Sequence, residues 1–237
     1  MSEFEGKVAV VTGAAGNLGA AVCDALARRG ARIAMLDLNQ KALVSCQAAL
    51  PTGTDVETFA TDLIDADAVA TTVNVVRERF GRIDILANVA GGFSMGPNLE
   101  ETPDRTWNLM MDLNARSVFN MCRTVVPIMR AAGHGRVVNV SARAALAGKG
   151  SMGPYCASKA AVITLTETLA QETKHAGITV NCILPGTVDT PQNRASMPDQ
   201  DHTTWVPTSA LADVILFLAS DAARCVTGAA VPVYGRS

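Results

Sequence analysis

The chain has 237 residues, of which 20 are Lys or Arg and 22 are Asp or Glu, so its formal net charge is -2. A hydrophobic content of 49% with 18% charged residues excludes a disordered or fibrous chain and allows a full buried core. The near-neutral balance, with no long Lys/Arg run, predicts neither a nucleic-acid partner nor a membrane surface as partner.

The six cysteines stand far apart, and no CxxC pair or Cys/His cluster is present. We therefore expect neither a zinc site nor a disulfide framework, and no bound metal. The first residues are acidic, the apolar run at 8–11 is too short for a signal peptide, and longer apolar stretches are broken before a bilayer span. These features predict a cytoplasmic location.

Short β-branched runs alternate with helical patterns along the chain. The predicted strands are 7–12, 32–36, 56–61, 83–89, 136–141, 178–184 and 229–233. The predicted helices are 17–29, 65–80, 106–132, 155–176 and 208–220. Strands separated by helices imply parallel pairing, so we predict an α/β fold with a Rossmann-type doubly wound parallel sheet, in a single domain over 1–237.

The loop between the first strand and the first helix contains Gly13, Gly16 and Gly19. Glycines there allow a tight turn and bring the backbone close to a pyrophosphate, which the helix N-terminus then holds. The spacing is GxxGxxG rather than GxGxxG, but its place in the first βαβ unit predicts a dinucleotide site. A GxGxxG string at 148–153 lies deep in the chain, and no strand ending in an acid follows its helix, so we interpret it as a flexible cleft loop.

Asp37 ends the second strand, where a carboxylate accepts both ribose hydroxyls of an adenosine and repels a 2′-phosphate. Leu38 follows it, so no adjacent cation favours that phosphate, and we predict NAD(H) in preference to NADP(H). The alternative role for Asp37 is a solvated helix cap. Asp62 ends the third strand, with adenine contact and helix capping as its alternatives. Residues 88–91 end the fourth strand with small side chains that suit close passage of a cofactor.

Tyr155 and Lys159 are four residues apart, on one face of a predicted helix. A neighbouring ammonium favours the phenolate and lowers the pKa of a tyrosine, which suits acid/base work. Ser141 ends a strand at the carboxyl edge, where its hydroxyl is expected to hold a substrate oxygen beside the phenol. Asn114, in the long helix, is expected to bind a water that passes protons to Lys159.

Together these residues resemble the short-chain dehydrogenase/reductases, over nearly the whole chain. The resemblance implies that Tyr155 is the catalytic acid/base, that Lys159 holds the nicotinamide ribose and lowers the Tyr155 pKa, that Ser141 orients the substrate oxygen and that Asn114 supports a water relay. The residues that the resemblance assigns to the cofactor are Gly13, Gly16, Asn17, Leu18, Gly19, Asp37, Asp62, Leu63, Asn88, Ala90, Gly91, Tyr155, Lys159, Pro185, Gly186, Val188 and Thr190. Two positions depart from the family pattern, with Asn17 in place of a loop glycine and Val89 in place of an asparagine; Asn tolerates a left-handed backbone, so the turn is expected to survive.

The predicted substrate-binding segment is 186–206. Its residues 189–198, with Trp205 and the run 89–93, are similar to dihydropteridine reductases, which reduce a quinonoid pterin with NADH and lack the catalytic serine. Ser141 therefore favours carbonyl/alcohol chemistry. The predicted substrate contacts are Phe93, Ser141, Tyr155, Asn193 and Trp205. For Phe93 and Trp205 the alternative is plain packing in the core or in a lid.

The predicted activity is NAD(H)-dependent interconversion of a secondary alcohol and a ketone, on a small-molecule carbonyl/alcohol substrate. The alternatives are pterin reduction, reduction of a 3-oxoacyl thioester, and a non-catalytic NAD(H)-binding sensor. The family resemblance also implies a homodimer or homotetramer formed by pairing of the two long helices.

Overall fold

The computed structural model describes residues 2–236. Its centre is a seven-stranded sheet in the order β3-β2-β1-β4-β5-β6-β9, and every neighbouring pair is parallel. The strands are β1 Val8–Thr12, β2 Arg32–Asp37, β3 Val56–Ala60, β4 Ile85–Asn88, β5 Gly135–Val140, β6 Ile178–Pro185 and β9 Ala230–Val233. The strand order reverses between β1 and β4, and the crevice at such a reversal is where ligands bind in doubly wound folds.

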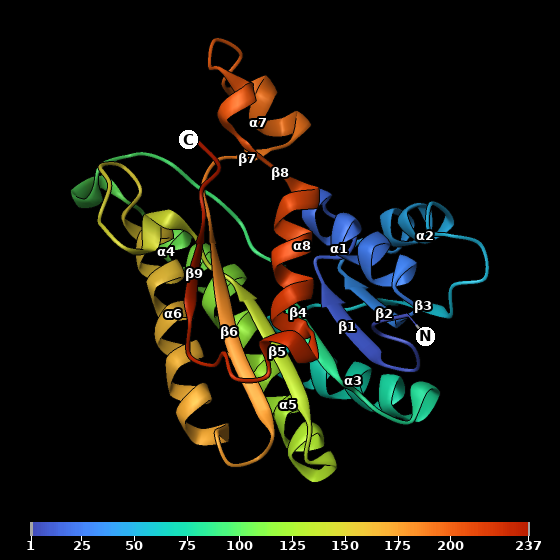
Figure 1. Ribbon diagram of the computed structural model, residues 1–237. Helices are drawn as coiled ribbons and strands as arrows, with labels where there is room; N and C mark the ends of the chain where they lie inside the picture. The colour runs from blue at the N-terminus through green and yellow to red at the C-terminus, as the bar shows by residue number, and fades with distance from the viewer. Residues whose placement is uncertain (1, 237) are drawn as a thin grey trace.

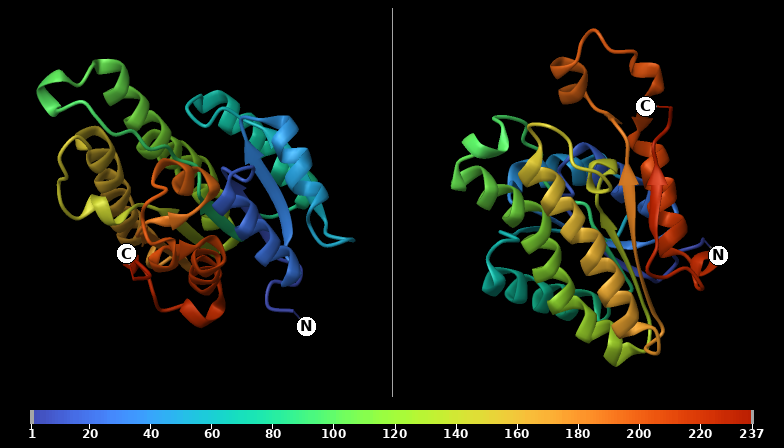
Figure 2. Two further views of the ribbon diagram at one scale, coloured as in Figure 1. Left: turned by 90° about the horizontal axis from the view of Figure 1, so that it is seen from above. Right: turned by 90° about the vertical axis from the view of Figure 1, so that its left-hand side faces the viewer.

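Helices cover both faces of the sheet (Figures 1 and 2). Along β1, Val8 and Val10 pack into one hydrophobic core, while Ala9 and Val11 pack into the other, because successive side chains of a strand point to opposite faces. The first face carries α3 Ala66–Phe80, α5 Ser117–Ala132 and α6 Gly153–Thr173; the second carries α1 Asn17–Arg28, α2 Gln40–Ala48 and α8 Thr208–Ala219. The predicted parallel α/β architecture is confirmed.

All seven predicted strands are present, with ends within two residues of the prediction. Two helices were not predicted. In α2 the single buried side chain is Leu43, so its sequence carries little apolar periodicity. The other is α7 Pro191–Ser196, which buries no residue and has Thr190 as its N-cap residue.

The helix predicted over 106–132 has three parts rather than one. It begins with α4 Asp104–Met110, continues through a π-helical turn over Met111–Arg116, and ends as α5. The π turn contains Asn114, whose side chain binds the backbone of Gly92 through two hydrogen bonds. Single π turns inside α-helices often mark functional sites, because the extra residue changes which side chains face a cleft.

The segment after β6 stands above the carboxyl edge of the sheet, where α7 projects from the body of the molecule (Figure 1). It is held at its base by the two-stranded pair β7 Val188–Asp189 and β8 Val206–Pro207. The C-terminal segment also reaches it, since the Arg236 N–H donates to the Thr204 carbonyl at 3.0 Å. Residues 186–206 therefore form a separate cap over the sheet edge.

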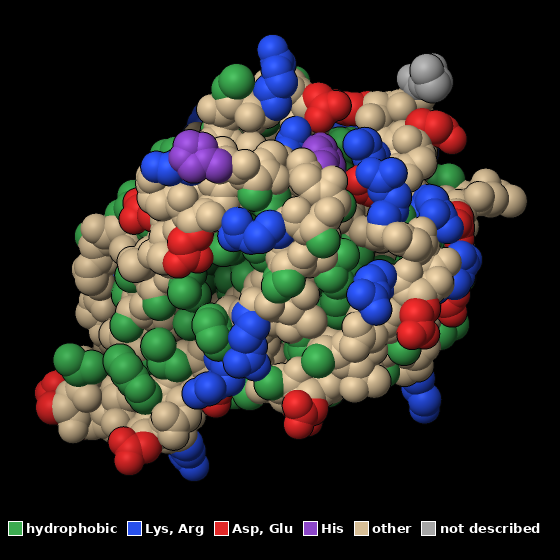
Figure 3. Space-filling model, turned by 90° about the horizontal axis from the view of Figure 1, so that it is seen from below, with side chains coloured by type: hydrophobic (Ala, Val, Ile, Leu, Met, Phe, Trp, Pro, Cys, Tyr) green, Lys and Arg blue, Asp and Glu red, His purple; other side chains and the backbone are tan. Residues whose placement is uncertain are grey.

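Seen from below, the surface mixes Lys and Arg with Asp and Glu, with hydrophobic side chains gathered between them (Figure 3). Among residues 2–236, no helix combines the length and apolarity that crossing a bilayer requires. The same residues contain no group of three or more His, Cys, Asp or Glu side chains arranged to hold a metal ion.

Candidate active site

The glycine loop after β1 packs against the end of β4. Gly13 has a left-handed backbone with φ +63°, and a Cβ there would lie 2.8 Å from the Ala90 Cα atom. A Cβ on Gly19 would overlap the Gly13 carbonyl oxygen. Glycine is thus required at both positions, and the backbone around the N-terminus of α1 is left open to a phosphate group.

Thr12 joins the two strands at the point where the strand order reverses. Its Oγ1 atom accepts hydrogen bonds from the backbone N–H groups of Val89 and Ala90, both at 3.1 Å. The loop and the end of β4 are therefore one rigid unit. Gly91 follows directly, so the predicted small-residue segment lies beside the predicted pyrophosphate loop.

Asp37 lies at the end of β2, beside the same loop. One carboxylate oxygen accepts from the Ala15 N–H at 3.2 Å and the other from the Asn39 N–H at 3.1 Å. The Asp37 side chain is partly exposed, which leaves lone pairs for a ligand. The cap of α2 is Asn39 rather than Asp37, so the capping alternative for Asp37 does not hold.

Asn17, which replaces a family glycine, makes a contact that its sequence did not indicate. Its Nδ2 atom donates to Gln192 Oε1 at 2.8 Å, and Gln192 belongs to α7. This hydrogen bond joins the glycine loop to the cap over 186–206. Leu18, the next residue, is half-buried against the α1 side of the core.

Lys159 is buried beside the segment after β4, with 5% of its surface exposed. Its Nζ atom donates to the Val140 carbonyl at 2.9 Å. A Cβ on Gly91 would lie 3.0 Å from Lys159 Nζ and 2.6 Å from Asn114 Oδ1, so the three residues converge on one point. Burial lowers the pKa of the Lys159 ammonium from 10.5 to about 8.

Asn114 is the centre of a buried hydrogen-bond network. Its Nδ2 atom donates to Ser158 Oγ at 3.0 Å, and the Ser158 hydroxyl donates to the Tyr155 carbonyl at 2.8 Å. Its Oδ1 atom accepts from the Gly92 N–H at 2.9 Å. The network holds the π turn, the segment after β4 and the first turn of α6 in a fixed arrangement.

Tyr155 lies in the first turn of α6, beside Phe93. Burial raises the pKa of its phenol to about 12, with Cys156 contributing in the same direction. This is opposite to the direction that the spacing of Tyr155 and Lys159 predicts. The Lys159 ammonium donates to the Val140 carbonyl instead, and the loss of hydration sets the direction of the Tyr155 pKa shift.

Ser141 does not lie as predicted. It is at the carboxyl end of β5, but only 2% of its surface is exposed and its hydroxyl donates to the Lys159 carbonyl at 2.7 Å. The hydroxyl is thus directed at the backbone of α6, and the predicted contact with a substrate oxygen is not seen in this arrangement. Ala142 follows with an extended backbone, at φ -162° and ψ 157°.

Several predicted cofactor residues serve their own loops. Asp62 Oδ1 accepts from the Ile64 N–H, and the Leu63 carbonyl accepts from Asn120 Nδ2. Asn88 is buried and donates to Asn139 Oδ1 at 2.8 Å, so its side chain crosslinks β4 and β5 instead of facing the crevice. A cofactor contact from Asn88 would therefore come from its backbone.

In the cap, Thr190 Oγ1 accepts from the Asn193 N–H, and Asn193 Nδ2 donates to the Val188 carbonyl at 2.8 Å. Trp205 is 7% exposed and packs on His202 with ring centroids 4.3 Å apart. Asn193 and Trp205 thus stabilise the cap itself, which matches the packing alternative for Trp205. At its start, Pro185 ends β6, and the Gly186 N–H donates to the Val233 carbonyl.

Three residues that build this site were not predicted to take part in it: Thr12, Ser158 and Gln192. Ser158 had a detectable signal, because it lies three residues after Tyr155 on the same helix face. Thr12 ends the first strand, where a hydroxyl is available to the neighbouring strand. Gln192 had no sequence signal, because its hydrogen-bond partner Asn17 is 175 positions away in the chain.

Comparison with known proteins identifies the class that this fold and site define. The chain belongs to the short-chain dehydrogenase family, whose model matches residues 7–201. It is 36% identical to a D-threitol dehydrogenase of Mycolicibacterium smegmatis, over 98% of this chain and 93% of that protein. It is 32% identical to the 3-oxoacyl-[acyl-carrier-protein] reductase FabG of Escherichia coli, over 98% and 97% of the two chains.

Solved structures show the same fold. The crystal structure of NAD+-bound xylitol dehydrogenase superposes with a TM-score of 0.92 at 29% identity, covering 98% of this chain and 99% of that one. Levodione reductase gives a TM-score of 0.92 at 30% identity, covering 98% and 97%. The chain is therefore an oxidoreductase of the class that acts on CH–OH and C=O groups.

Proposed function

We propose that the protein is an NAD(H)-dependent oxidoreductase that interconverts a secondary alcohol and a ketone, with Tyr155 as the acid/base. The observation that carries the proposal is the convergence of Lys159 and Asn114 on Gly91, one turn of α6 from Tyr155. Dehydrogenases of polyols among the relatives support a hydroxylated substrate.

The residues around the glycine loop fit a dinucleotide. Gly13 and Gly19 leave the N-terminus of α1 open to a pyrophosphate, Asp37 would accept from the adenosine ribose, and the Lys159 ammonium would bind the nicotinamide ribose near Gly91. The NAD(H) nicotinamide supplies or accepts a hydride when bound. The negative charge of Asp37 opposes a 2′-phosphate, which supports a preference for NAD(H) over NADP(H).

Tyr155 moves the proton on the substrate oxygen. Because burial raises its pKa to about 12, the phenol is protonated at neutral pH and donates a proton to a ketone oxygen. Oxidation of an alcohol requires the phenolate, which high pH favours. At neutral pH the phenol is therefore in the protonated form that reduction of a ketone requires.

A second candidate, NADH-dependent pterin reduction, is favoured by the position of Ser141. The resemblance to dihydropteridine reductases implies an enzyme without a catalytic serine, and the Ser141 hydroxyl is occupied by the Lys159 carbonyl. The presence of Ser141 in the sequence therefore no longer argues against a pterin. A 3-oxoacyl thioester is a third substrate class, supported by the similarity to FabG.

The test is to follow NADH consumption by the purified protein with three substrate classes: cyclic and polyol-derived ketones, quinonoid dihydropterin, and a 3-oxoacyl thioester. The proposal expects the highest kcat/KM with a ketone. A preference for dihydropterin would transfer the assignment to the second candidate. NADH binding without consumption of any substrate would overturn an enzymatic role and favour a sensor.

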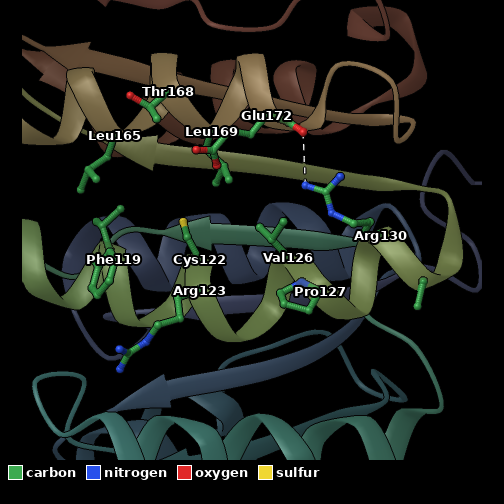
Figure 4. A pocket seen from close by; sticks show the side chains of 12 residues that line it. Phe119, Cys122, Arg123, Val126, Pro127, Arg130, Leu165, Thr168, Leu169 and Glu172 are labelled. Carbon is green, nitrogen blue, oxygen red and sulfur yellow. Dashed lines mark hydrogen bonds between the residues drawn. The ribbon is translucent and has the colours of Figure 1, made fainter.

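We also propose that two copies pair through a groove between α5 and α6 (Figure 4). The groove encloses about 630 Å³, and apolar side chains from both helices line it, including Phe119, Val126, Leu165 and Leu169. At one end the Arg130 guanidinium donates to the Glu172 carbonyl at 3.2 Å. An exposed apolar surface of this kind is stabilised when a second copy covers it.

A cytoplasmic location stays a prediction from the sequence.

A further inference from the structure

We propose that Ser141 is a positioning residue for Lys159 and does not contact the substrate. The observation is a pair of hydrogen bonds that run in opposite directions between β5 and α6. Lys159 Nζ donates to the Val140 carbonyl at 2.9 Å, and Ser141 Oγ donates to the Lys159 carbonyl at 2.7 Å. The inference rests on the proposed role of Lys159 in binding the cofactor.

The two hydrogen bonds fix different parts of one residue. The first fixes the ammonium end of Lys159, and the second fixes its backbone within α6. A carbonyl oxygen has two lone pairs, so the Lys159 carbonyl serves the helix and the Ser141 hydroxyl together. A free lysine side chain has many rotamers, so a site that needs a fixed ammonium gains from anchoring both ends of the residue.

The position of the ammonium decides its use. A Cβ on Gly91 would lie 3.0 Å from Nζ, so a small movement of α6 away from β5 would carry the ammonium away from the segment after β4. Ser141 opposes that movement. Its own N–H donates to the Ile183 carbonyl at 2.9 Å, so the strand end that carries the hydroxyl is itself held within the sheet.

The same geometry removes Ser141 from contact with substrate. A serine hydroxyl has a single proton to donate, and here it goes to the Lys159 carbonyl. The residue is only 2% exposed, which leaves little of its surface for a substrate oxygen. The end of β5 acts on the reaction through Lys159.

The experiment compares the full-length wild type with Ser141→Ala, Lys159→Met and the double variant. NADH affinity is measured by fluorescence titration, and kcat and KM with the best substrate of the panel. We expect Ser141→Ala to weaken NADH binding and lower kcat by about fivefold each, the size of effect that one lost hydrogen bond carries. In the Lys159→Met background the same change should have no further effect, because the residue being positioned is gone.

A substrate-contacting Ser141 would give a different pattern. NADH affinity would then match that of the wild type, and Ser141→Ala would reduce kcat equally in both backgrounds; either result overturns the proposal. Cysteine is similar in size to serine and is a weaker donor, so Ser141→Cys should give smaller losses of NADH affinity and of kcat than Ser141→Ala. It replaces Ser141→Ala if that variant does not fold. Failure of the wild type to bind NADH would instead overturn the proposed function.

Discussion

Phe93 lies edge-on to Tyr155, with ring centroids 4.9 Å apart and ring planes at 83°. This T-shaped contact is a favoured arrangement of two aromatic rings. Phe93 itself is 60% exposed, so it lies on the outer side of Tyr155, where we propose that the substrate binds. It also removes water from the phenol, and that loss of hydration contributes to the raised pKa of Tyr155.

Removing the Tyr155 hydroxyl should abolish turnover and leave the ring packing intact. We expect Tyr155→Phe to reduce kcat by about 100-fold to 10,000-fold, the range that a positioned acid or base contributes. NADH affinity, measured by titration, should remain within about twofold, because the lost group acts on the substrate. Tyr234→Phe is the matched control and should retain activity; near-normal turnover by Tyr155→Phe would contradict the assignment.

Lys159 should make the stability of the protein depend on pH in a defined window. Its pKa is about 8 in the folded state against an ordinary 10.5, so between these values the unfolded chain binds the proton and the folded chain does not. The free energy of unfolding therefore rises with pH through this window, by at most about 3 kcal/mol.

The buried thiols of Cys23 and Cys122 have raised pKa values and act in the opposite direction, so the wild-type curve alone is not diagnostic. The difference between wild type and Lys159→Met isolates the lysine. Urea denaturation from pH 7 to pH 10.5 should show that difference growing in favour of the wild type. A constant difference would mean that the buried ammonium carries no penalty.

Asp37 should control the choice between the two nicotinamide cofactors. Asp37→Ala removes a negative charge from the position expected to meet the 2′-phosphate, so we expect the ratio of kcat/KM for NADPH over NADH to rise by about 10-fold to 100-fold. Asp37→Asn separates charge from hydrogen bonding, since its oxygen still accepts from the Ala15 N–H. A wild type that already prefers NADPH would show that this carboxylate does not face the adenosine.

The glycine loop should tolerate no side chain at Gly19. A Cβ there would overlap the Gly13 carbonyl oxygen, so Gly19→Ala must displace the loop, and we expect NADH affinity to fall by about tenfold or more with a lower Tm. Gly148→Ala is the control from the GxGxxG string, because a Cβ at Gly148 meets no atom within 4 Å among the described residues. Loss of NADH affinity in Gly148→Ala would show that the phosphate group binds at the 148–153 loop and not at the glycine loop after β1.

The groove between α5 and α6 should set the oligomeric state. Phe119 is 46% exposed within it, and Phe119→Asp places a charge where a second copy would pack. We expect light scattering after size exclusion to show a smaller assembly than for the wild type. Val75→Asp, at a 45% exposed position on α3, should leave the assembly unchanged. Equal masses for all three proteins would exclude this groove as an interface.

The sheet was predictable because each buried strand is a short apolar run bounded by glycine, proline or charge, and burial on both faces makes such runs conspicuous. The direction of individual side chains was not. The sequence places Ser141 at the end of β5, but successive residues of a strand point to opposite sides, so the hydroxyl of Ser141 faces α6.

The burial of individual side chains was equally hard to predict from the sequence. The i, i+4 spacing of Tyr155 and Lys159 shows that they share a helix face, yet it does not show how deeply each is buried. Burial determines both pKa shifts in this structure, raising that of the phenol and lowering that of the ammonium. The π turn at Asn114 also has no local sequence signal, and the Asn114 side chain binds the backbone of Gly92, which is distant in the sequence.

The hydrogen bond between Asn17 and Gln192 has a kinetic consequence. It joins the glycine loop, where the dinucleotide is proposed to bind, to α7, so we expect the dinucleotide to dissociate only after this hydrogen bond opens, and the smaller reactant to exchange while it stays closed. Turnover would then follow a compulsory order, with the dinucleotide first on and last off. Product-inhibition patterns would reveal that order, and Gln192→Ala should speed dinucleotide release in stopped-flow traces.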